Sequence, residues 1–138
     1  SPKVKEEQVK SIRSYGHHFG MAYQLIDDLL DYVGSKTIMG KNTGDDLSEG
    51  KLTLPIILAL AKTTGREKNS LLHALKQKSS ANLEEIVEII TSSGAIEDTR
   101  KAALHEIEQA REHLLHLPEN EYRKALESLT EYSADRIF

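Results

Sequence analysis

The chain has 138 residues, of which 29% are charged and 38% hydrophobic, and its net charge is −4 at pH 7. These values are ordinary for one soluble domain or part of a larger one, and they give no overall basic field that would favour nucleic acid. The lack of cysteine excludes disulfides, zinc–thiolate sites and thiol nucleophiles. No apolar stretch approaches the roughly 20 residues that span a bilayer, and the polar start is unlike a signal peptide. We therefore expect a soluble cytoplasmic protein.

The first segment predicts one long amphipathic helix from Ser1-Pro2 to about Tyr32. Serine caps free amides, and proline suits the first helical position. Gly16 and Gly20 lie four residues apart on one face, and each costs about 1 kcal/mol of helix propensity relative to alanine. We therefore expect both glycines to pack closely against another helix. The apolar residues of the segment recur every three or four positions, at Val9, Ile12, Phe19, Tyr23, Ile26 and Leu30.

Residues 33–52 interrupt this periodicity with four glycines, three lysines and three acidic residues. Loops longer than about 12–15 residues are uncommon and are usually functional or disordered. The glycines and charges predict an ordered functional loop here.

The rest of the chain returns to helical periodicity, which predicts an all-α fold. Gly65 and Gly94 are expected to cap helices at their carboxyl ends, and Pro118 is expected to separate the last two. The expected helices cover residues 53–64, 67–77, 82–93, 95–116 and 119–137.

The sequence GMAYQLIDDLLDY, residues 20–32, concentrates carboxylates on a helix that is otherwise apolar. Asp27 and Asp31 are one turn apart on one face, Asp28 lies beside them, and Gln24 lies one turn earlier. Two unit charges 4 Å apart repel by about 4 kcal/mol at an effective dielectric constant of 20. A hard divalent cation relieves this repulsion, and magnesium prefers carboxylate and phosphate oxygens. The pattern therefore suggests a carboxylate–magnesium–phosphate bridge.

The same acidic residues could instead form the solvated face of an amphipathic helix whose leucines are buried. The segment that follows favours the metal interpretation, because Lys41 and Lys51 lie in the glycine-bearing loop, where ammonium groups could meet diphosphate oxygens. A new helix is expected to begin at Thr53-Leu54-Pro55.

Several segments of the chain resemble motifs of a known enzyme family. GMAYQLIDDLLDY resembles the second aspartate-rich motif of trans-isoprenyl diphosphate synthases, and GKNTGDDLSEGKLTLP resembles the lysine-bearing segment that follows it. YGHHFGMAYQ is similar to the family's approach to that motif, and GAIEDTRKAA is a weaker match. The resemblance is strong across residues 15–60 and rests on the helix pattern and weaker motifs beyond them. It is greatest to bacterial octaprenyl diphosphate synthases, whose products become quinone side chains. Tyr23 departs from the phenylalanine that is common in the family.

The resemblance implies the carboxy-terminal helices of the isoprenoid synthase helical-bundle fold. In that family magnesium ions bind an allylic diphosphate, whose cation is attacked by isopentenyl diphosphate after diphosphate leaves. By motif, Asp27, Asp28 and Asp31 would hold Mg²⁺, directly or through water. Lys41 and Lys51 would contact the allylic diphosphate.

Four other polar residues receive weaker assignments. Gln24 would help to position the substrate or ordered waters. Asp46 matches an acidic position of the family, where it would either order the loop or act as a ligand. His17 and His18 are interpreted as surface or packing residues.

No other Asp-Asp-x-x-Asp cluster occurs in residues 1–138. The resemblance therefore implies that these residues are the carboxy-terminal portion of one synthase domain, without the helices that carry the first aspartate-rich motif and the isopentenyl diphosphate site. We expect this piece to be inactive alone. Apolar residues that would cover the missing helices predict a homo-oligomer, a dimer or larger. No nucleic-acid partner and no transmembrane segment are expected, although the product would enter membranes.

Three other interpretations stay open. The product could be geranylgeranyl, heptaprenyl or solanesyl diphosphate. The chain could be a non-catalytic helical partner of a catalytic subunit, although such a subunit need not keep mutually repelling carboxylates. A terpene cyclase-like lyase also ionises diphosphates with magnesium, but the lysine-bearing loop is typical of the elongating enzymes.

Overall fold

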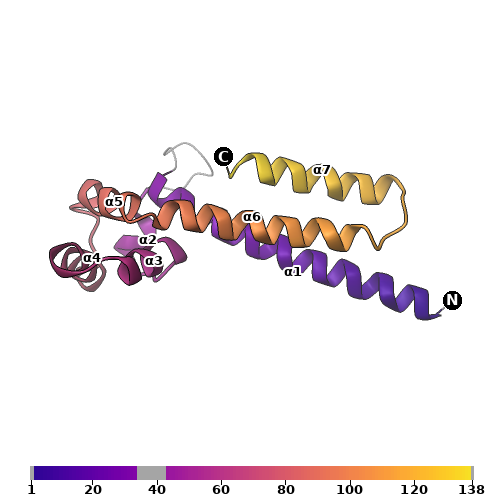
Figure 1. Ribbon diagram of the computed structural model, residues 1–138, viewed down its shortest axis with the longest axis horizontal. Helices are drawn as coiled ribbons and strands as arrows, with labels where there is room; N and C mark the ends of the chain where they lie inside the picture. Colours follow the sequence, from indigo (N-terminus) through magenta and orange to yellow (C-terminus); the bar gives the residue numbers. More distant parts are fainter. Residues whose placement is uncertain (1, 34–42, 138) are drawn as a thin grey trace. The chain divides into compact units, whose positions relative to one another are not determined.

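The structure is a computed structural model that describes residues 2–33 and 43–137, and the predicted all-α fold is confirmed over these residues (Figure 1). No helix in this described part is both long enough and apolar enough to cross a bilayer. The helices are α1 (Pro2–Val33), α2 (Asp45–Ser48), α3 (Leu54–Lys62), α4 (Gly65–Gln77), α5 (Leu83–Ser92), α6 (Ala95–Leu114) and α7 (Glu121–Asp135).

Of the two glycines that were predicted to end helices, one does so and the other does not. Gly94 directly follows the last cap residue of α5 with φ of 90°, as predicted for a carboxy-terminal glycine. Gly65 was predicted to cap α3, and this is wrong because Gly65 is the first residue of α4. The chain leaves α3 earlier, at Thr63, where the backbone is extended and the side-chain hydroxyl donates to the Ala59 carbonyl at 2.8 Å.

The prediction of close helix packing at Gly16 and Gly20 is also wrong for the described residues. A Cβ atom added at either position would meet no atom within 4 Å. Both glycines are exposed on α1, so their spacing alone did not identify a helix contact.

The chain divides into two compact units, and α1 and α6 contribute residues to both. The first unit joins residues 1–26 to residues 101–138. Its core contains Tyr15, Ala110 and Leu114, with Phe19, Leu117 and Leu126 packed against them. The Tyr15 hydroxyl forms a hydrogen bond with the Thr130 hydroxyl at 2.9 Å. This bond ties the amino-terminal helix to α7.

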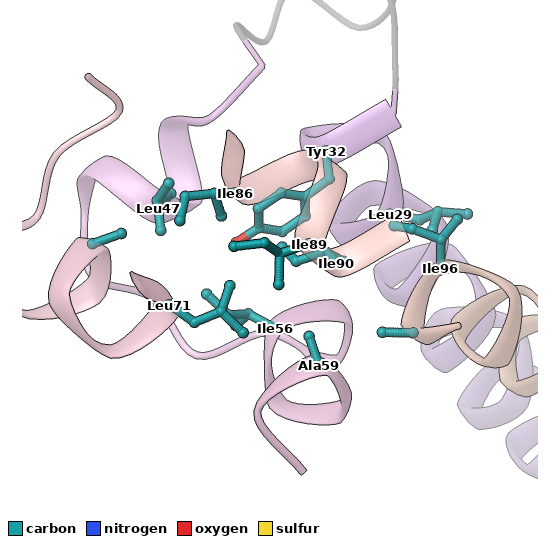
Figure 2. Close-up of a cluster of buried hydrophobic side chains, with 12 residues drawn as sticks. Leu29, Tyr32, Leu47, Ile56, Ala59, Leu71, Ile86, Ile89, Ile90 and Ile96 are labelled. Carbon is teal, nitrogen blue, oxygen red and sulfur yellow. The ribbon is translucent and has the colours of Figure 1, made fainter. Parts of the chain in front are cut away.

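The second unit, residues 27–100, holds the larger apolar core (Figure 2). The end of α1 contributes Leu29 and Tyr32, and the short α2 contributes Leu47. In Figure 2 the Tyr32 ring lies among the isoleucines of α5, and Leu47 faces Ile86. The other members of this core are Ile56, Ala59, Leu71, Ala74, Ile89, Ile90, Ala95 and Ile96. The core therefore fixes the carboxyl end of α1, where the acidic residues lie, and the α2 turn.

Candidate functional site

The carboxyl end of α1 carries the three aspartates of the acidic cluster, Asp27, Asp28 and Asp31. Asp31 is 1% exposed and Asp28 is 7% exposed, whereas Asp27 is half-buried. A solvated helix face would expose its carboxylates, so this alternative from the sequence does not describe Asp28 and Asp31. Burying a carboxylate is costly unless it is hydrogen-bonded or compensated by positive charge. Carboxylate oxygens are also the donors that a hard divalent cation prefers.

The α2 turn folds back onto Asp31 through two backbone amides. The Asp46 amide donates to Asp31 Oδ2 at 3.2 Å. The Gly44 amide donates to the main-chain carbonyl of Asp31 at 2.9 Å. Gly44 adopts φ of 92°, a conformation that glycine accepts readily, and this lets the chain enter α2 at that point. Both the carboxylate of Asp31 and its backbone are thus held by one turn.

Lys51 is brought to the same turn by Asp46. The Asp46 side chain is 2% exposed, and its Oδ1 lies 3.9 Å from the Lys51 Nζ. The Lys51 amide donates to the Asp46 carbonyl at 2.8 Å. The Lys51 side chain is itself 53% exposed. The ammonium group therefore lies within ion-pair distance of a buried carboxylate, and its side chain is exposed enough to reach a ligand.

The other polar residues that the sequence pointed to lie in different surroundings. Lys41 lies outside the described residues. Gln24 is exposed on α1, in the first unit. His17 is exposed, and His18 Nδ1 lies 2.6 Å from Glu106 Oε2, as expected for a surface residue and a packing residue.

Sequence reasoning missed Tyr32, which is buried close to Asp31, and Thr53, which is buried as well. Burial raises the pKa of the Tyr32 phenol above its ordinary value, and the negative charge of Asp31 raises this pKa further. Neither hydroxyl makes a hydrogen bond of good geometry within the described chain. The aromatic residue that directly follows the last aspartate of the DDLLD sequence was the available signal.

The residues present fit the magnesium that the motif implies. Magnesium is usually bound through one or two carboxylates plus substrate phosphates rather than by an all-protein cage. No group of three histidine, aspartate or glutamate side chains in residues 2–33 and 43–137 is placed to hold a metal by itself. Asp28 and Asp31 are buried carboxylates on one helix turn, and Asp27 is beside them. They provide hard oxygen donors of the kind that such a shared site requires.

Comparison with known proteins identifies the family of this chain. The family model for polyprenyl synthetase matches residues 2–91, and the chain belongs to this family. The chain is 41% identical over 133 residues to an all-trans-nonaprenyl-diphosphate synthase (geranyl-diphosphate specific) of Rhodobacter capsulatus, which covers 96% of this chain and 41% of that protein. It is 38% identical over 131 residues to the octaprenyl diphosphate synthase of Escherichia coli, with coverage of 94% and 41%.

Solved structures agree with this assignment. A polyprenyl synthase from Caulobacter crescentus, complexed with calcium and isoprenyl diphosphate, superposes with a TM-score of 0.84 at 37% identity, covering 94% of this chain and 40% of that one. A geranylgeranyl pyrophosphate synthase from Corynebacterium glutamicum, complexed with isoprenyl diphosphate and magnesium, gives 0.84 at 30% identity, with coverage of 93% and 37%. The fold is therefore that of the helical isoprenoid synthases. The chain spans about two fifths of the length of the curated relatives that it matches.

Proposed function

We propose that this chain is the carboxy-terminal part of a trans-polyprenyl diphosphate synthase and that it holds the leaving diphosphate of the allylic substrate. The observation that carries the proposal is that one turn joins the buried carboxylate of Asp31 to Lys51, in a chain of the polyprenyl synthetase family. A second buried carboxylate, Asp28, lies on the same helix turn as Asp31. Relatives whose structures contain a divalent metal and isoprenyl diphosphate support the same substrate class.

The reaction would break the bond between the allylic carbon and the diphosphate oxygen, so that inorganic diphosphate leaves with the bonding electrons. The double bond of isopentenyl diphosphate would then attack the allylic carbon, a proton would be lost, and the chain would be five carbons longer. Magnesium would supply positive charge that makes the diphosphate a better leaving group. Asp27, Asp28 and Asp31 would hold that charge at the end of α1.

The lysines would act on the same leaving group. Lys51 presents its ammonium group beside the buried Asp46 carboxylate, where it would neutralise charge that develops on the diphosphate oxygens. Lys41 is proposed to make a second contact of this kind, and Gln24 to position the substrate or its ordered waters. These roles require groups that are fixed before the substrate arrives, and the α2 turn provides that fixation for Asp31 and Lys51.

Within this class we propose a long-chain product, octaprenyl diphosphate, that becomes a quinone side chain. The relatives are named for products of several lengths, including nonaprenyl and octaprenyl diphosphate. Similarity therefore supports a polyprenyl diphosphate synthase, and the octaprenyl length is a further proposal. We also propose that the complete protein acts in the cytoplasm as a homodimer.

The proposal is tested by incubating the full-length protein and this 138-residue chain separately with labelled isopentenyl diphosphate, an allylic diphosphate and magnesium. We expect elongation by the full-length protein only, because the chain lacks a second aspartate-rich cluster. Chromatography of the products measures chain length. Elongation by the 138 residues alone would refute their proposed dependence on the rest. A full-length protein that is folded but inactive alone, and that activates a second subunit, would favour the non-catalytic partner instead.

A further inference from the structure

We infer that Asp46 is a positioning residue that fixes two groups of the proposed diphosphate site at once: Asp31 through its amide and Lys51 through its carboxylate. This inference rests on the proposed function. It concerns a residue that would not itself touch the substrate.

The first contact restrains Asp31. The Asp46 amide donates to Asp31 Oδ2 at 3.2 Å, and Asp31 is 1% exposed. An amide that occupies one side of a buried carboxylate fixes the plane in which its oxygens lie. The direction in which Asp31 offers an oxygen to a cation therefore depends on the position of the Asp46 backbone.

The second contact restrains Lys51. The Lys51 amide donates to the Asp46 carbonyl at 2.8 Å, and the Lys51 Nζ lies 3.9 Å from Asp46 Oδ1. Ion pairs with one exposed partner contribute little to stability, because solvent screens them and the side chain loses rotamer freedom. The effect of this pair should therefore be found in ligand binding, where a long flexible side chain is held in one direction before the ligand arrives.

The α2 turn is held in place by the core, so the contacts of Asp46 with Asp31 and with Lys51 have one fixed relation to each other. Leu47, the next residue after Asp46, is fully buried in the core of the second unit. The turn is bounded by Gly44 and Gly50, with φ of 92° and 68°. A Cβ atom at Gly50 would lie 3.3 Å from the Leu75 carbonyl, which shows how closely this end of the turn approaches α4. One rigid turn thus sets the relation between a carboxylate of α1 and a lysine of the following loop.

The test uses Asp46→Asn in the full-length protein, with Asp45→Asn as the matched control. Asp45 is the preceding residue of the same turn, and in the described chain its side chain makes no ion pair or hydrogen bond with Asp31 or Lys51. Calorimetry measures the binding of inorganic diphosphate with magnesium, and steady-state kinetics measures KM for the allylic diphosphate. We expect D46N to weaken diphosphate binding about ten-fold and to raise KM by a similar factor, as for residues that orient metal or substrate ligands. D45N should stay within about two-fold of the wild type.

A double-mutant cycle tests whether Asp46 acts through Lys51. In a Lys51→Gln background, D46N should weaken diphosphate binding by less than about two-fold, because its target is already absent. If D46N matches D45N while the wild type binds diphosphate and elongates, the inference is wrong and the proposed function stands. Full additivity of D46N and K51Q would also overturn it. A wild type that neither binds diphosphate nor elongates would overturn both.

Folding of each variant is checked by circular dichroism. If D46N fails to fold, Asp46→Glu replaces it, since glutamate keeps the charge and moves it by one methylene. We then expect a smaller loss of diphosphate affinity that is again coupled to K51Q. Wild-type affinity in a folded D46E variant would overturn the inference.

Discussion

Leu47→Ala is expected to destabilise the second unit by about 3 kcal/mol. Leu47 is 0% exposed, lies in the core with Ile86, and is the side chain through which the α2 turn enters that core (Figure 2). Removing its three terminal carbons forfeits about 2.4 kcal/mol of transfer free energy at about 0.8 kcal/mol per buried methylene. Incomplete collapse of the cavity adds to this loss, and buried leucine-to-alanine changes cost about 2.7–5 kcal/mol in well-packed cores.

The assay is urea unfolding followed by far-ultraviolet circular dichroism. The control is Leu52→Ala, which makes the same chemical change five residues later at a position that is 60% exposed. We expect the control to change the free energy of unfolding by no more than about 0.5 kcal/mol. At roughly 3–4 °C per kcal/mol for a chain of this size, L47A should lower Tm by about 10 °C. Equal stability of L47A and L52A would refute the conclusion that α2 is anchored in the core.

Three further outcomes are expected from single substitutions. Asp31→Asn should weaken magnesium-dependent diphosphate binding by about 10–100-fold in calorimetry, while the Asp46 amide keeps an acceptor; unchanged binding would remove Asp31 from the site. Asn120→Ala should lower the free energy of unfolding by about 1 kcal/mol, because the Asn120 side chain accepts from the amides of Tyr122 and Arg123 at 3.0 Å; no change in urea unfolding would argue against this cap. The pKa of Tyr32 is raised above its ordinary value of 10.0, so the folded state keeps the phenol proton at a pH where the unfolded state has lost it. The contribution of Tyr32 to the free energy of unfolding is therefore lost as pH rises above about 10. Tyr32→Phe should therefore flatten the alkaline loss of stability, whereas Tyr132→Phe, at an exposed residue, should not.

The sequence predicted the helices well wherever one local signal determined the outcome. The first helix follows directly from the three- and four-residue recurrence of its apolar positions and ends at Val33, one residue from the prediction. Gly94 follows α5 with a positive φ that favours glycine. The prediction at Gly65 was wrong because the extended backbone of Thr63 ends α3 before the glycine is reached. A glycine near a helix end predicts the approximate position of the boundary, whereas tertiary packing determines the residue at which the helix ends.

The residues of the candidate site were proposed from the sequence, but their arrangement was not. Motif and charge pointed to the carboxylates of α1 and to the lysine at position 51. That Asp28 and Asp31 would be buried was not evident, because periodicity describes how residues repeat along a helix and not which neighbours cover them. The same limit explains Asp46, whose amide and carboxylate connect two predicted site residues only after a four-residue helix has formed within the predicted loop. Such short helices carry no periodic signal.

The division of α1 and α6 between the two units has a consequence for the order of folding. The second unit is one continuous stretch, residues 27–100, so all of its partners are present once that stretch has been synthesised. The first unit joins the two ends of the chain, and its Tyr15–Thr130 hydrogen bond connects residues 115 positions apart. Contacts of such high sequence separation form late, because the entropy of closing the chain must be paid before they are made. We therefore expect the acidic end of α1 to fold during synthesis, before α7 has been made. The amino-terminal half of α1 should pack only after α7 is available.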